Sequence, residues 1–143
     1  MKQNFDPTCV FCKIADGVIP SYKIYEDDDI LAFLDVNPVT YGHALVITKQ
    51  HFDTFLSVPK DLMNKAYNVA QRIGQVQMKA LGAKGINILT NCYECAGQSV
   101  RHFHIHIIPR YAAVDGFKLE FKTNLKDISL PDVVTKFKDE FTK

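Results

Sequence analysis

The sequence predicts an α+β fold in which a five-stranded antiparallel sheet packs against one long helix. Two short apolar-rich segments, residues 22–26 and 29–34, flank the acidic turn Glu26-Asp27-Asp28-Asp29, as expected of a hairpin. A segment with helical periodicity, residues 59–81, follows, and strand-like segments stand on either side of it. The chain has 143 residues, which is the size of one domain.

Three further segments complete the predicted sheet. Residues 43–49 read His-Ala-Leu-Val-Ile-Thr-Lys and are typical of a largely buried strand. Residues 85–90 begin at Gly85 and form the fourth expected strand, and residues 102–108 form the fifth.

The long helix is the clearest element of the pattern. Its apolar residues recur at spacings of three and four, which predicts one buried face. These residues are Leu62, Ala66, Val69, Ile73, Val76 and Ala80. Ser57 is the expected N-cap, Pro59 suits the first turn, and Gly82 suits the end of the helix.

Two shorter helices are expected, one at 9–16 and one near 131–141. Residues 112–143 are richer in Lys and Asp, but apolar side chains persist among them and argue against disorder. We therefore expect a single domain, residues 1–143, with a C-terminal extension.

Composition and charge exclude several classes of protein. The net charge is +1, so no long-range field attracts a nucleic acid or an acidic membrane. The N-terminus lacks an apolar run of signal-peptide length, and no stretch reaches the roughly 18–20 apolar residues of a membrane span. These features predict a cytoplasmic protein without nucleic-acid or membrane partners.

The fifth strand carries the most informative motif, His102-Phe103-His104-Ile105-His106. Alternation along a strand places its three histidines on one face and its apolar residues on the other. A strand face that is only exposed to solvent could equally well carry Thr, Lys or Glu. Three histidines on one face therefore favour a functional site. One metal ion does not explain all three, because His102 and His106 lie roughly 13 Å apart along a strand.

This motif resembles the signature of the histidine triad (HIT) family. The resemblance extends over residues 97–110, where Gly-Gln-Ser precedes the histidines, over residues 30–38 with an Asp-x-x-Pro motif, and over residues 42–47 with Gly-His. It covers roughly residues 9–111 and points to the bacterial, Hint-related branch. It implies a HIT-type sheet and a homodimer.

In that family the middle histidine is the nucleophile, here His104. A neutral imidazole offers a nitrogen lone pair to phosphorus without an activating base, and its other nitrogen can donate to a carbonyl. The resemblance implies attack at the α-phosphate of a nucleoside phosphate derivative and a nucleotidyl-histidine intermediate. His106 and Ser99 would assist, by stabilising charge and donating to the phosphate or leaving group.

The resemblance also assigns substrate-binding residues. Asp35 corresponds to the acidic residue that accepts hydrogen bonds from ribose hydroxyls, although a turn-forming role explains it equally well. Asn91 corresponds to a polar residue near the phosphate and ribose, and His43 to a histidine at the edge of the active site. Gln98 and Ser99 would donate to phosphate oxygens from a tight loop, which Gly97 would bring close to the ligand.

Two features near the site allow more than one interpretation. An apolar slot for the base is expected from Phe11, Phe33 and Val36, with core packing as the competing explanation. The segment after Asn91 departs from the family pattern, because Tyr93 stands where related sequences carry a residue that tolerates positive φ. A loop of different shape would put the role of Asn91 in doubt.

The four cysteines form two Cys-x-x-Cys pairs. The pair Cys9 and Cys12 has metal-ligand spacing, and the resemblance supplies His51 and His102 as the other ligands of a structural Zn²⁺. Two buried thiols are the alternative. The second pair, Cys92 and Cys95, is expected to bind no metal, and no organic cofactor is expected.

The predicted function is a nucleotide hydrolase or transferase resembling purine nucleoside phosphoramidases. One alternative with the same chemistry is a dinucleoside polyphosphate hydrolase. Another is a nucleotide-binding regulatory or scaffold protein, and a metal-dependent hydrolase that uses His104 and His106 is the fourth. All of them share a small nucleotide as the partner.

Overall fold

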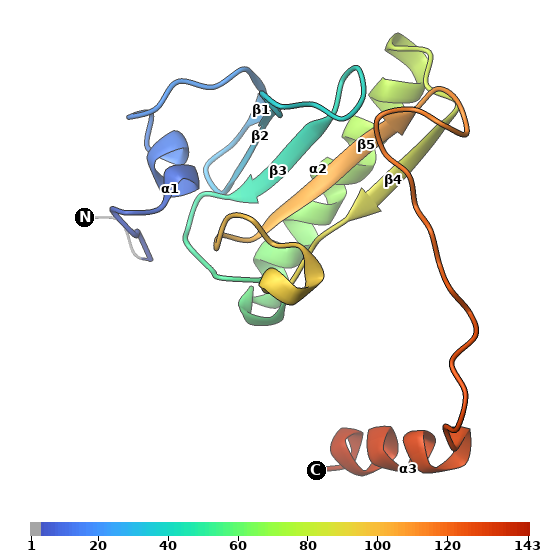
Figure 1. The fold of residues 1–143 in the computed structure, drawn as a ribbon. Coiled ribbons are helices and arrows are strands. Elements are labelled where there is room, and N and C mark those ends of the chain that lie inside the picture. The colour runs from blue at the N-terminus through green and yellow to red at the C-terminus, as the bar shows by residue number, and fades with distance from the viewer. Residues whose placement is uncertain (1–3) are drawn as a thin grey trace.

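A twisted antiparallel sheet forms the centre of the computed structural model, which describes residues 4–143 (Figure 1). Its strands lie in the order β1-β2-β3-β5-β4, and neighbouring strands are antiparallel throughout. The strands are β1 (Lys23–Glu26), β2 (Ile30–Leu34), β3 (Ala44–Thr48), β4 (Gly85–Leu89) and β5 (His104–Arg110). The predicted five-stranded sheet is confirmed. Residues 1–3 lie outside the described residues. They belong to the N-terminal segment in which no signal peptide is expected.

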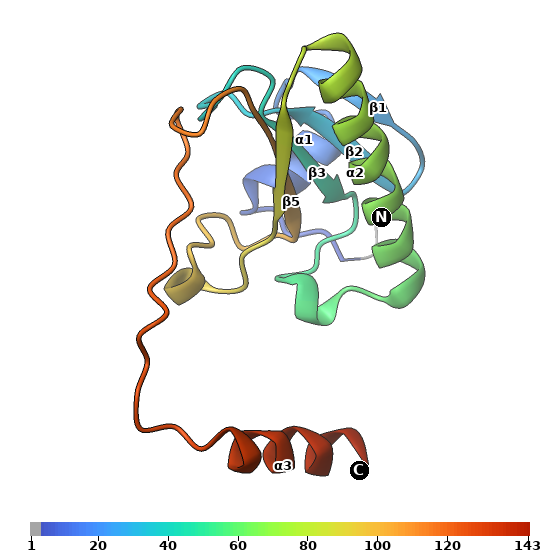
Figure 2. The same cartoon turned by 90° about the vertical axis from the view of Figure 1, so that its right-hand side faces the viewer.

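Helices cover the two faces of the sheet unequally (Figures 1 and 2). The long helix α2 (Lys60–Ala80) crosses one face, and the short helix α1 (Val10–Ala15) lies against the other. Helix α1 packs on β2 and β3, where Phe11 and Cys12 share a core cluster with Leu31, Phe33 and Leu45. The histidines of β5 therefore lie on the face that α1 only partly covers.

Alternation along β5 builds the main core, as predicted. Phe103, Ile105 and Ile107 are buried against the apolar side of α2, where Val69 and Ile73 contact the same cluster. The strand begins at His104, two residues later than expected. Its ladder with β3 ends at His104, because the next residue toward the N-terminus, Phe103, donates its N–H to the carbonyl of Phe52 instead.

The C-terminal half of α2 differs from the prediction. Val76 is 59% exposed and Ala80 is exposed, so these two members of the expected stripe do not enter the core. Val76 instead borders an open cavity. Gln77 takes the buried place, because its Nε2 donates to the carbonyls of Gly42 and Ile107 at 3.0 Å each.

The start of α2 also differs. Ser57 is not its N-cap: it ends the 3₁₀ helix η1 (Phe55–Ser57), and its hydroxyl donates to the carbonyl of Thr54. The N-cap is Pro59, and no side chain caps this end. The chain makes a separate short turn before α2, so Ser57 lies too far back to reach the first free N–H groups.

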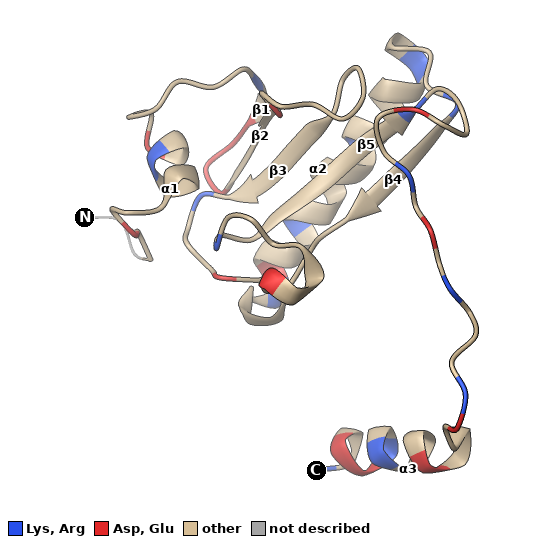
Figure 3. Ribbon diagram, viewed as in Figure 1, with Lys and Arg blue, Asp and Glu red and all other residues tan. Residues whose placement is uncertain are grey.

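The C-terminal extension leaves the sheet and ends in helix α3 (Leu130–Phe141), well away from the rest of the chain in both ribbon views (Figures 1 and 2). Residues 118–143 are exposed throughout. Basic and acidic residues are interspersed along the extension (Figure 3). Within residues 4–143, no helix combines the length and apolarity that a membrane crossing requires.

Candidate active site and metal centre

His104, the predicted nucleophile, is the first residue of β5. Its ring is buried, with 4% of the residue exposed, and the ring of Phe11 packs edge-on against it with centroids 5.1 Å apart. Its Nδ1 lies 2.7 Å from the carbonyl oxygen of His102. A carbonyl only accepts, so Nδ1 carries the proton and Nε2 keeps its lone pair. Burial lowers the pKa of His104 below its ordinary value, which favours this neutral form.

His106 forms a second chain of contacts with His43 and Asp35. The N–H of Val39 donates to His43 Nδ1 at 3.2 Å, so His43 carries its proton on Nε2. That Nε2 lies 2.9 Å from His106 Nδ1 and 3.7 Å from an Asp35 carboxylate oxygen. His106 accepts at Nδ1, which leaves its own proton on Nε2.

Burial also controls the charge of this pair. Desolvation lowers the pKa of His106 to about 4, with smaller contributions from His104 and His43. Desolvation likewise lowers the pKa of His43, while the carboxylate of Asp35 opposes the shift. Both rings are therefore neutral at pH 7, so they can bind an anion through N–H donors but not through positive charge.

The side chains of Asp35, His43 and His106 also offer metal-binding atoms within 4.8 Å of one another. His43 Nε2 and His106 Nδ1 already face each other at hydrogen-bond distance, with the proton of His43 between them. The tautomers deduced above point to a hydrogen-bonded chain here, and His104 is not a member of this cluster.

The predicted zinc ligands lie together in a separate, largely buried cluster. Cys9 and Cys12 come from the start of α1, His51 follows β3, and His102 precedes β5. Cys12 Sγ lies 3.3 Å from His51 Nδ1 and 3.5 Å from His102 Nδ1, and Cys9 Sγ lies 3.4 Å from His102 Nδ1. Such separations match the edges of a tetrahedron around Zn²⁺.

The outer nitrogens of both histidines support the same interpretation. His102 Nε2 donates to the carbonyl of Thr48 at 2.7 Å, and His51 Nε2 lies 2.9 Å from an Asp53 carboxylate oxygen. Both rings thereby present an unprotonated Nδ1 to the two thiols, as metal-binding histidines do. The donor set fits a structural zinc ion. Sequence reasoning missed Thr48 and Asp53, although Asp53 stands two residues after a proposed ligand.

The loop between β4 and β5 carries the remaining predicted residues. Asn91 donates from Nδ2 to the carbonyl of Gly97 at 3.3 Å, and Ser99 is exposed just before the histidines. Gln98 is only 5% exposed, and both polar atoms of its amide contact protein backbone. Within residues 4–143, no hydrogen bond or ion pair joins these residues to His104 or His106.

The structure also places the predicted apolar slot and the second cysteine pair. Phe11 and Phe33 are buried and meet edge-on at 5.7 Å, so core packing accounts for them, whereas Val36 is 70% exposed. Cys92 is partly buried and Cys95 exposed, and neither joins a metal-binding cluster within residues 4–143.

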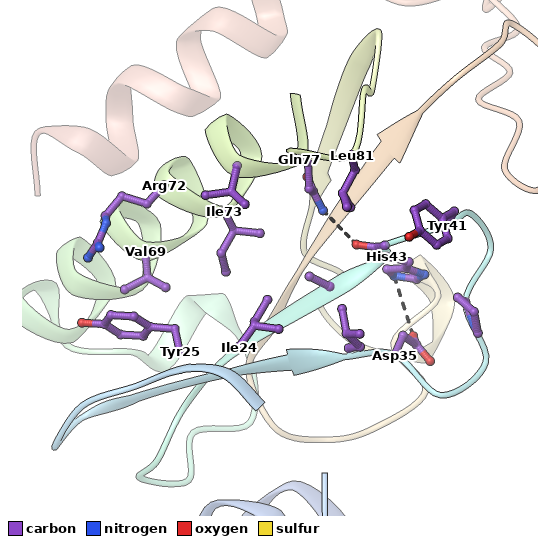
Figure 4. A pocket seen from close by; sticks show the side chains of 15 residues that line it. Ile24, Tyr25, Asp35, Tyr41, His43, Val69, Arg72, Ile73, Gln77 and Leu81 are labelled. Carbon is purple, nitrogen blue, oxygen red and sulfur yellow. Dashed lines mark hydrogen bonds and ion pairs between the residues drawn. The ribbon is translucent and has the colours of Figure 1, made fainter. Parts of the chain in front are cut away.

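A cavity of about 560 Å³ opens between the β1–β2 end of the sheet and α2 (Figure 4). Asp35 and His43 contribute to its wall, but His104 and His106 do not. Its lining is mainly apolar, from residues such as Ile24, Leu34 and Val76. This cavity is therefore distinct from the surroundings of the candidate nucleophile.

The fold and the triad define the class of protein, and comparison with known proteins agrees. The HIT domain family model matches residues 16–113, and the chain belongs to this family. A solved structure of a HIT family member from Bacillus subtilis is 40% identical, with a TM-score of 0.86, and covers 95% of this chain and 96% of its own.

Two further matches bear on chemistry. The adenosine 5′-monophosphoramidase HNT1 of Saccharomyces cerevisiae is 38% identical over 107 residues, which are 75% of this chain and 65% of the yeast protein. A zinc-bound histidine triad family protein from Mycobacterium smegmatis is 38% identical, with a TM-score of 0.70, and covers 83% of this chain and 84% of its own.

Proposed function

We propose that this chain hydrolyses nucleoside 5′-phosphate derivatives at the α-phosphate, with purine nucleoside phosphoramidates as the substrate class. The observation that carries the proposal is the tautomer of His104, whose Nδ1 is held by a backbone carbonyl while Nε2 keeps a lone pair. The name of the yeast relative, a monophosphoramidase, supports the choice of substrate.

The reaction has two displacements at phosphorus. His104 Nε2 forms a bond to the α-phosphorus as the bond to the amine leaving group breaks, and the amine departs with a proton that the exposed hydroxyl of Ser99 relays from solvent water. Water then attacks the same phosphorus, the bond to Nε2 breaks, and the nucleoside monophosphate leaves. The Nε2–H of His106 donates to the phosphate oxygens, where negative charge accumulates.

The other predicted contacts hold the nucleotide. Asp35 accepts hydrogen bonds from the ribose hydroxyls, and His43 fixes His106 through the contact at 2.9 Å. Asn91 and Ser99 approach the phosphate from the loop before β5. For Gln98 the geometry favours a different role from the phosphate contact that the resemblance implies, because its amide already has partners in the protein.

Substitution of the nucleophile tests the proposal. We expect His104→Ala to lose AMP release from adenosine 5′-phosphoramidate by at least about 10³-fold, since a covalent route needs the ring nitrogen. Gln75→Ala, on the exposed side of α2, serves as the control. Faster release from diadenosine polyphosphates would favour the polyphosphate hydrolase, and AMP binding without turnover would favour a nucleotide-binding regulator.

We further propose that Cys9, Cys12, His51 and His102 hold one structural Zn²⁺. The Nδ1 and Sγ distances support it, as does the zinc-bound relative. The ion would tie α1 to the ends of β3 and β5, while the chemistry at phosphorus stays with His104. Elemental analysis is expected to give about one zinc per chain, and Cys9→Ser to lose it. A metal-free wild-type chain, purified without chelator, would refute the site.

We also propose a homodimer, as the resemblance implies. Helix α3 supports it, because the helix carries apolar residues on one side and no contact with the rest of the described chain covers them. Its large apolar residues are Leu130, Val133, Val134, Phe137 and Phe141, between 41% and 84% exposed. A second chain is the partner that would bury them.

A further inference from the structure

The turn between β4 and β5 has a backbone shape that its sequence does not favour. Tyr93 has φ +72° and ψ 163°. This combination is accessible almost only to glycine, because a Cβ atom collides with the neighbouring carbonyl. Something outside Tyr93 must hold the turn in this shape.

Gln98 holds the turn in place through two hydrogen bonds to Tyr93, one from its side chain and one from its backbone. Its side-chain Oε1 accepts a hydrogen bond from the N–H of Tyr93 at 2.7 Å. Its backbone N–H donates to the carbonyl of Tyr93 at 3.1 Å. The N–H and the C=O of the strained residue are thus both bound by the same glutamine, which is buried and therefore shielded from competing water.

The other end of the amide fastens the turn to a second segment. Gln98 Nε2 donates to the backbone carbonyl of Asp53 at 2.6 Å. The side chain of Asp53 contacts His51 Nε2 at 2.9 Å, so the anchor is part of the segment that carries a proposed zinc ligand. Gln98 therefore links two loops that are 45 residues apart in sequence.

We propose that Gln98 is a positioning residue, which clamps the turn at Tyr93 and anchors it to Asp53 so that Asn91 and Ser99 face the nucleotide. The inference rests on the proposed function for the identity of the ligand. The clamp explains how a tyrosine occupies a position that calls for glycine. It also explains why the amide needs no contact with phosphate to matter for binding.

The clamp predicts a change in backbone protection. In Gln98→Ala, the Tyr93 amide is expected to exchange hydrogen at least about tenfold faster, because its acceptor is gone. The KM for adenosine 5′-phosphoramidate should rise roughly tenfold, while kcat falls less than about threefold, since His104 is untouched. Gln75→Ala, on the exposed side of α2, is the matched control and should change neither quantity.

A second substitution, at Tyr93, distinguishes a positioning role of Gln98 from direct contact between Gln98 and the nucleotide. Glycine adopts the backbone angles of residue 93 without help, so Tyr93→Gly in the Gln98→Ala background should restore most of the lost affinity. Affinity for 5′-AMP, measured by calorimetry, gives the same comparison without turnover. Should Gln98→Ala fail to fold, Gln98→Glu keeps an acceptor for Tyr93 and replaces the donor to Asp53 with a carboxylate oxygen, which the Asp53 carbonyl repels. It should preserve protection at Tyr93.

The outcomes distinguish this inference from the proposed function. Unchanged exchange at Tyr93 in Gln98→Ala, or an affinity for AMP that Tyr93→Gly does not restore, would overturn the positioning role. The second result would indicate direct contact between Gln98 and phosphate. A wild-type chain that binds AMP with the expected clamp effects, yet releases none from the phosphoramidate, would overturn only the hydrolase.

Discussion

Each histidine near the candidate site has its tautomer set by a contact of one of its ring nitrogens. The carbonyl of His102 fixes His104, the N–H of Val39 fixes His43, and His43 in turn fixes His106. Backbone groups of the segments just before β3 and β5 begin these chains, so the main chain itself orients the rings. Orientation by fixed dipoles costs no reorganisation when a substrate arrives.

Burial of His106 makes the stability of the protein depend on pH. Its pKa is about 4 in the folded chain, whereas an unfolded histidine has 6.5. The unfolded state therefore binds a proton between these values that the folded state does not, and stability falls as the pH drops from 6.5 to about 4. His43, His104 and Asp35 are the titratable groups that face the ring.

We expect this ring to account for about 1–2 kcal/mol of the stability lost between pH 7 and pH 5. Urea unfolding of the wild type and of His106→Gln at both values measures it, because the variant lacks the titrating group. The gap in unfolding free energy between the two proteins should narrow at pH 5. An equal gap at both values would show that His106 takes up no proton on unfolding.

At the scale of elements, α2 holds the active-site strand in place through a polar contact as well as through its apolar side. Gln77 is 2% exposed and donates to the carbonyls of Gly42 and Ile107. It thereby connects the helix to β5 and to the turn before β3, which carries His43. A helix packed only by apolar side chains could slide along the sheet more easily.

Gln77→Leu should destabilise the protein by about 1–3 kcal/mol. The leucine fills much of the same space but leaves a buried carbonyl, of Ile107, and a partly buried one, of Gly42, without this donor. Gln75→Leu, on the exposed side of the same helix, is the control and should change the urea midpoint little. Equal midpoints for the two variants would mean that the carbonyls find other partners.

At the scale of the whole molecule, the C-terminal extension is the part that a single chain leaves incomplete. Helix α3 has an ordinary N-cap at Ser129, which accepts from the N–H of Asp132, so its formation is locally encoded. Its apolar side is nevertheless exposed, and a helix of 12 residues gains most of its stability from packing. A partner chain would provide that packing.

Phe137→Asp should shift the protein from dimer toward monomer, as measured by light scattering coupled to gel filtration. A charge in the middle of the apolar side opposes its burial. Lys138→Asp, on the same turn of α3, is the control and should leave the mass unchanged. A wild-type chain that is monomeric at every concentration would refute the dimer.

Local pattern was sufficient for much of this protein. Period-two alternation in β5 determined which side chains meet α2, and spacings of three and four placed the middle of that helix. The same logic failed for Val76 and Ser57, because a cavity and an extra turn, both products of packing, decide their surroundings.

Short-range order along the chain was enough to predict the sheet, the shared face of the three histidines and the family, because each depends on which residue types follow one another. Tertiary structure alone decided which nitrogen of each ring carries the proton and that residues 9, 12, 51 and 102 converge. It also decided that Gln98 reaches Asp53 and holds Tyr93 in a glycine-like conformation. The contact of Gln98 with Asp53 and the convergence of the four residues join segments far apart in the chain, so they follow only from how the elements pack. The contacts of His104 with His102 and of Gln98 with Tyr93 are local, but they depend on side-chain rotamers that packing selects.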